Sequence, residues 1–178
     1  MTSEEMRDKK KTATASEITM DSVQLIASVL YCFPELAKVK LEEETSSVIL
    51  GFCVNTEPAE ELLAKAKQTI YDGLAVYHLL DKDGDWAFNF YYHEMVVYIV
   101  RDIGSMSRQE INLIVTMMRD AMGSILEIDD NSGADEDIIS TQTDMIDHRL
   151  VFLRENRVRH NMQGVREDGR VMIFDKNN

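Results

Sequence analysis

Three aspartates alternate in the short stretch "DKDGDW", residues 81–86. Carboxylate oxygens are the ligands that Ca²⁺ and Mg²⁺ prefer in proteins. Asp81, Asp83 and Asp85 are therefore the first candidates for a metal site. They follow a predicted helix, whose last turn carries a negative partial charge that a bound cation would offset. The stretch thus admits a calcium or magnesium site at residues 81–85.

The same spacing is found in the first half of an EF-hand loop, which this stretch resembles over about six residues. Such a loop needs glycine at its sixth position and a bidentate glutamate at its twelfth. Trp86 and Tyr92 stand there instead. The residues after the loop also favour a strand rather than an exiting helix. A solvated turn at the end of a helix explains most of the stretch.

A second acidic group lies in "DMIDH", where Asp144, Asp147 and His148 are neighbours on one helical surface. Carboxylate and imidazole groups at this spacing can hold a divalent metal, although a polar helix face has the same pattern. His93 and Glu94 could pair as acid and base at a predicted break between strands. The sequence contains no GxSxG, HExxH or glycine-rich phosphate motif.

The missing catalytic motifs, an acidic body with a basic end and a heptad-like helix seam, the last two described below, predict a non-catalytic protein-interaction or regulatory module that associates with itself or with a protein partner. The alternative is a divalent-metal-dependent enzyme or metal-binding protein that uses the acids at 81–85 or 144–148. Beyond calcium or magnesium, no cofactor is indicated.

The chain has 178 residues and a formal net charge of −13, which opposes binding to nucleic acid and to anionic membranes. Its charge is uneven, because residues 149–178 carry 7 basic and 4 acidic side chains, or +3. This basic end is expected to pack against the acidic remainder or against a second copy. The alternative is that the arginines of this end contact RNA or phosphate. The negative charge of the whole chain opposes such a contact.

Cys32 and Cys53 both lie in apolar stretches, which predicts buried free thiols in a reducing compartment. The first residues lack the apolar segment of a signal peptide. No apolar run approaches the roughly 18 residues that a membrane helix requires. We therefore expect a cytoplasmic protein with no membrane segment.

The periodicity of the chain predicts an α+β fold in the order α-β-β-α-β(β)-α-α-β-β. Residues 1–16 are expected to form a disordered tail and residues 17–178 a single domain. The sheet is expected to be mixed and largely antiparallel, with helices packed on it. The run 86–103 is too long for one strand and should break near His93–Glu94, and Asp168-Gly169 should form a tight hairpin turn.

One predicted helix, Thr56 to Leu80, carries a heptad-like seam that includes Ala66, Ile70 and Gly73. Small residues in the seam permit close approach of another element. The preferred interpretation is that the seam lies on the chain's own sheet. A pair of such helices in a homodimer is the alternative.

Overall fold

The structure is a computed structural model that describes residues 13–81, 84–130 and 133–175. Its elements, in order, are α1 (Ala15–Cys32), β1 (Lys38–Glu42), β2 (Ser47–Cys53), α2 (Glu60–Asp81), β3 (Phe88–His93), β4 (Val96–Asp102), α3 (Arg108–Met122), the short 3-10 helix η1 (Gly123–Ile125), α4 (Glu136–Asn156), β5 (Met162–Glu167) and β6 (Arg170–Asp175). The predicted α+β class is confirmed. The predicted order differs from the structure only in η1, which closes α3.

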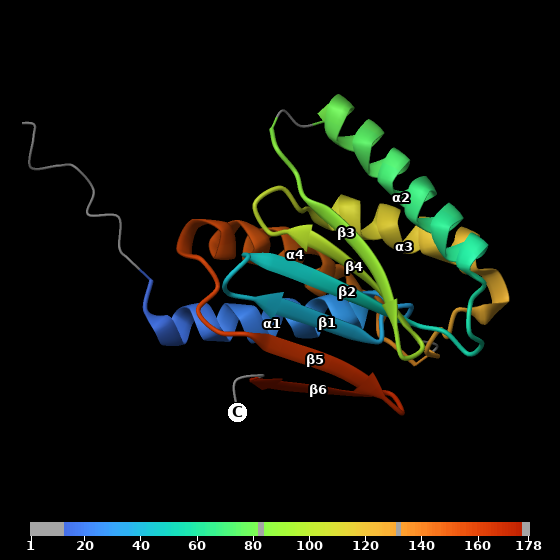
Figure 1. Ribbon diagram of the computed structural model, residues 1–178. Coiled ribbons are helices and arrows are strands. Elements are labelled where there is room, and N and C mark those ends of the chain that lie inside the picture. The colour runs from blue at the N-terminus through green and yellow to red at the C-terminus, as the bar shows by residue number, and fades with distance from the viewer. Residues whose placement is uncertain (1–12, 82–83, 131–132, 176–178) are drawn as a thin grey trace, which may run out of the picture.

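The six strands form one open sheet in the order β3-β4-β2-β1-β5-β6, and every pair of neighbours is antiparallel (Figure 1). The sheet was expected to be mixed and largely antiparallel, and it is entirely antiparallel. β1 lies between β2 and β5, with Lys38 opposite Val165. The last hairpin of the chain therefore extends a sheet that its first half begins.

The helices pack on one face of the sheet, where alternate strand residues point into a common core. This core contains side chains from α1, α2, α3 and α4 together with the inward residues of the strands, among them Val39, Leu50, Phe52, Val97 and Ile99. The opposite face carries a smaller buried cluster of Ile49, Val96 and Tyr98. No helix of the described ranges contributes to that second cluster.

Local chemistry sets the helix ends. Thr14 caps α1 and forms a reciprocal capping box with Glu17. The predicted start of α2 at Thr56 is wrong, and the Thr56 hydroxyl donates a hydrogen bond to the Asn55 side chain at 3.0 Å. The helix begins four residues later, at Glu60.

Two tight turns shape the hairpins. The run 86–103 divides where expected, at Glu94 and Met95, whose φ angles are 46° and 65°. The break is a two-residue turn and not a bulge, since Val96 pairs directly with His93. Asp168 and Gly169 have φ angles of 50° and 73°, which confirms the predicted turn between β5 and β6.

The predicted seam of α2 lies on the chain's own core. Ala66 and Ile70 are 1% and 0% exposed, and the space beside Gly73 is filled by the Met117 side chain of α3. Leu80, expected to continue the seam, is 76% exposed instead. The inner side of α2 therefore holds the helix in place, while Leu80 at its end lies outside the core.

Candidate functional site

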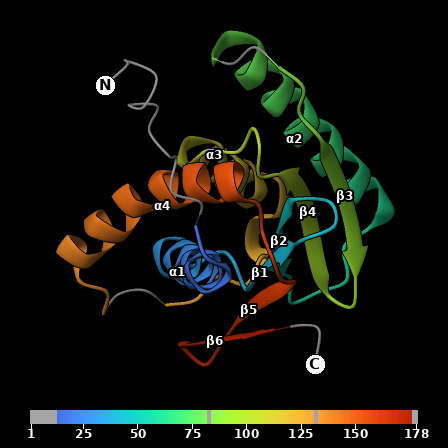
Figure 2. The ribbon, with the colours of Figure 1, turned by 90° about the vertical axis from the view of Figure 1, so that its left-hand side faces the viewer.

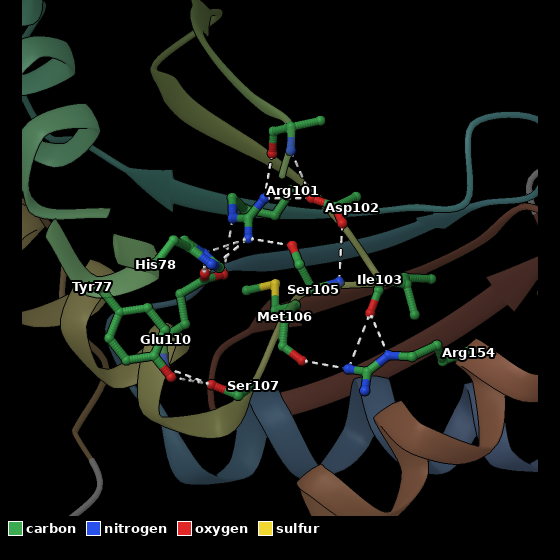
Figure 3. Close-up of polar contacts among 11 residues, drawn as sticks. Tyr77, His78, Arg101, Asp102, Ile103, Ser105, Met106, Ser107, Glu110 and Arg154 are labelled. Carbon is green, nitrogen blue, oxygen red and sulfur yellow. Dashed lines mark hydrogen bonds and ion pairs between the residues drawn. The ribbon is translucent and has the colours of Figure 1, made fainter. Parts of the chain in front are cut away.

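A buried polar cluster fastens the C-terminal end of α2 to the sheet and to α3 (Figure 3). Its centre is Arg101 of β4, which points to the same side as the apolar Val97 and Ile99 and is 0% exposed. The guanidinium donates two parallel hydrogen bonds to the Glu110 carboxylate of α3, Nε to Oε2 at 2.9 Å and Nη2 to Oε1 at 2.8 Å. Such a bidentate pair is the strongest arrangement of these two groups.

His78 joins this pair from the last turns of α2. Its Nε2 lies within hydrogen-bond distance of Glu110 Oε1 and 3.1 Å from Arg101 Nη2. A guanidinium nitrogen can only donate, and a carboxylate can only accept. Nε2 can therefore either donate to Glu110 or accept from Arg101, depending on the tautomer of the ring. The ring is held flat against Trp86, with centroids 5.0 Å apart and planes 10° apart.

A second carboxylate completes the cluster. Asp102 Oδ1 lies 2.6 Å from Arg101 Nη1, and Asp102 accepts N–H bonds from Ala87 at 2.8 Å and Ser105 at 2.9 Å. Partial burial raises the pKa of Asp102, but the bonds from Ala87 and Ser105 and the charge of Arg101 outweigh it, so the pKa lies below its usual value. Arg101 also donates to the Ala87 carbonyl and to Ser105 Oγ.

The cluster is built to hold elements together rather than to bind a ligand. Arg101, Glu110 and His78 are 0%, 0% and 4% exposed, and they bond to one another and to the backbone. Buried charges are tolerated only when they are paired in this way. Because the cluster holds His78 inward, the next two residues of α2, Leu79 and Leu80, point out of the core.

The outer side of α2 carries a continuous row of residues spaced by three and four, which we call the outer stripe: Leu62, Lys65, Thr69, Asp72, Val76 and Leu79. Residues at this spacing share one side of a helix. Val76 is 55% exposed and Leu79 is 82% exposed, and Leu80 beside them is 76% exposed. Figures 1 and 2 both show α2 at the periphery of the molecule, with its C-terminal end projecting beyond the other elements.

A hollow of about 240 Å³ adjoins the other end of the outer stripe, between α2 and α3. It is lined by Leu62, Lys65, Ala66, Thr69, Met117, Asp120 and Ala121. Small and apolar side chains form most of its wall, with Lys65 and Asp120 as its charged members. The outer stripe therefore begins beside a recess and ends in an apolar projection.

The predicted metal ligands do not come together in the part of the chain that the structure describes. Asp81 is the last residue of α2, Asp83 lies outside the described residues, and Asp85 is exposed. Within the described ranges, no group of three or more His, Cys, Asp or Glu side chains is placed to hold a metal ion. The calcium or magnesium site at 81–85 remains a prediction.

The second acidic group has another role. Asp144, Asp147 and His148 are exposed on α4, and Asp147 accepts the backbone N–H of Arg108 at 2.8 Å. Asp147 thus meets the first turn of α3. His93 and Glu94 are also exposed, 3.6 Å apart in the turn between β3 and β4.

The sequence patterns did not predict the polar cluster around Arg101. "SRQE" predicts a capping box at residues 107–110, and Ser107 does accept the Glu110 N–H at 3.3 Å. The Glu110 side chain, however, turns away to Arg101 and His78. One signal was available: Arg101 falls at an inward position of a strand whose alternate residues, Val97 and Ile99, are apolar.

Among the described residues, no helix is both long enough and apolar enough to cross a membrane. The chain was also compared with protein-family models, with curated proteins and with solved structures. None of the three comparisons gives a match.

Proposed function

We propose that this protein is a non-catalytic interaction module that associates with itself, and that the outer side of α2 is its contact surface. The observation that carries the proposal is the exposure of Val76, Leu79 and Leu80, at 55%, 82% and 76%. Single exposed apolar residues are common on proteins. Three large ones within about one turn of a helix form a patch of the kind that marks an interaction site.

The anchoring of α2 supports this role. His78 is bonded to Glu110 and stacked on Trp86 directly before Leu79. A surface on a rigid element loses little conformational entropy when it binds, which favours affinity. The cluster around Arg101 thus presents the patch in a fixed direction.

The charge of the outer stripe is compatible with a second copy as the partner. The chain carries a formal net charge of −13, so two copies repel each other over most of their surfaces. The outer stripe has one basic residue, Lys65, and one acidic residue, Asp72. Two copies can therefore meet there without adding to the repulsion.

Sedimentation velocity over a range of about 1 to 100 μM tests the proposal, since this range covers micromolar dissociation constants. We expect the mass to rise from one chain to two as the concentration increases. A mass of one chain throughout the range would contradict self-association, whatever surface is involved.

A further inference from the structure

We infer that two copies bind through antiparallel pairing of α2 with α2, so that the apolar projection of each copy enters the hollow of the other. This inference rests on the proposed self-association and names its geometry. An interface about a two-fold axis must be self-complementary, because the same surface serves on both sides. The outer stripe meets this condition, with a recess beside Leu62 and a projection at Leu79.

The spacing of the outer stripe fits an antiparallel helix pair. Its residues are separated by 3, 4, 3, 4 and 3 positions, the repeat that keeps one side of a helix against a partner helix. The order of these intervals is the same in both directions. Reversing the stripe about the midpoint of Thr69 and Asp72 therefore places Leu79 of one copy opposite Leu62 of the other. The contact would be about 25 Å long.

The recess suits an inserted leucine. Its volume of about 240 Å³ lies between α2 and α3, with Leu62, Ala66 and Met117 in its wall. Methionine adapts its shape to a neighbouring side chain. Leu79, at 82%, has the highest exposed fraction of the large apolar side chains among the described residues.

The two charges of the outer stripe complement each other only between copies. Lys65 and Asp72 are seven residues apart, about 10 Å along one helix, which is too far for a direct ion pair. In the antiparallel arrangement Asp72 of the second copy lies opposite Thr69, one turn from Lys65. Each dimer would therefore contain two Lys65–Asp72 pairs, which fix the direction of the helices more than they add affinity.

The first experiment removes the projection. Leu79→Ser should raise the dimer dissociation constant by about 100-fold or more, because each dimer loses two inserted apolar side chains, one at each end of the helix pair. The matched control is Val151→Ser on α4, a residue that is 45% exposed and distant in sequence. The control should stay within about twofold of the unmodified chain. Circular dichroism checks that both variants keep their helices.

The second experiment tests the direction of the helices. Lys65→Asp and Asp72→Lys should each weaken the dimer by about tenfold, since each places like charges together twice. An equimolar mixture of the two variants should recover the original affinity, because opposite charges then meet at both positions. The Lys65→Asp/Asp72→Lys chain should recover it as well. Lys67→Asp, with the same change of charge on another side of α2, is the control.

The outcomes separate the two proposals. A dimer that is unaffected by Leu79→Ser would overturn the α2 interface and leave self-association standing. Single charge variants that bind as well as the unmodified chain would overturn the antiparallel arrangement. A parallel pair would instead place Lys65 opposite Lys65 and Asp72 opposite Asp72. A chain that never dimerises would instead contradict the proposed function itself.

Discussion

Two arginines lie at inward positions of the sheet, one in each half of the molecule, and they are stabilised in different ways. Arg101 of β4 meets carboxylates, those of Glu110 and Asp102. Arg166 of β5 meets mainly backbone carbonyls. It donates to Leu36 at 3.3 Å, to Phe33 at 3.2 Å and to Leu30, with Asp129 farther away at 3.5 Å.

The difference shows that an arginine on the sheet can stabilise a packed helix in two ways, by capping its C-terminal end or by pairing with a buried carboxylate. α1 has no basic residue in its last turn, so Arg166 supplies from another element the positive charge that a helix C-terminus favours. Arg101 supplies no cap. It links β4 to α3 through a buried ion pair with Glu110, and its Nη2 lies 3.1 Å from His78 of α2. The loss of its partner should therefore cost more than the loss of a capping donor.

The largest effect is expected from Arg101→Met. This change leaves Glu110 buried without its counter-charge, and breaking a buried pair on one side typically costs about 3–5 kcal/mol of unfolding free energy. Urea titration followed by circular dichroism measures the loss. A cost below about 1 kcal/mol, the size of an ordinary neutral hydrogen bond, would mean that the Arg101 cluster is held no more tightly than the Arg166 contacts.

Arg166→Met should cost less, about 1–3 kcal/mol, because it strands neutral carbonyl groups at the end of α1 rather than a buried charge. Urea titration under the same conditions gives the value. The same or a larger loss than in Arg101→Met would break the comparison. It would indicate that Arg166 acts chiefly through its charge on Asp129.

The Arg101→Met/Glu110→Leu chain sharpens the comparison. Replacing both members of a buried ion pair by apolar residues is often nearly neutral. We expect this double variant to regain at least half of the stability that Arg101→Met loses, with His78 and Trp86 retained as neighbours. A double variant as unstable as the single one would show that packing volume, not the unpaired charge, causes the loss.

The smallest effect is expected from Asp102→Asn, about 1 kcal/mol at pH 7, and it should depend on pH. The pKa of Asp102 is lowered in the folded state, so its contribution is present above its usual pKa and lost as the pH falls through the lowered one. The unfolding free energies of the unmodified chain and of Asp102→Asn should therefore differ more at pH 7 than at pH 3. A constant difference would contradict this assignment.

The element pattern was predictable because it follows from local chemistry. Pro34 stops α1, and the alternation of Val39 and Leu41 with Lys38 and Lys40 marks β1 as half-buried. The turn at Asp168-Gly169 has a sequence signature of its own. Sheet order was not predictable in the same way, since the pairing of β1 with β5 joins residues 38 and 165 through contacts that no short window contains.

The candidate site was less predictable than the fold. Arg101, Glu110 and His78 come from three elements and meet only after the sheet and helices have packed. Each residue alone has an ordinary explanation: a polar strand end, a helix cap and a helix-face histidine. The exposure of Leu79 was also hidden, because helical periodicity gives the direction of a side chain relative to its neighbours but not how far the core extends.

The position of β1 also affects how the chain can mature during synthesis. β1 and β2 leave the ribosome well before Met162–Glu167, the strand that closes the other edge of β1. An unpaired strand edge is a template for mispairing with other chains, and pairings so distant in sequence form slowly. Lys38 and Lys40 lie on this strand, and lysine is a residue that discourages such mispairing. The nascent chain thus carries its own protection until its last hairpin arrives.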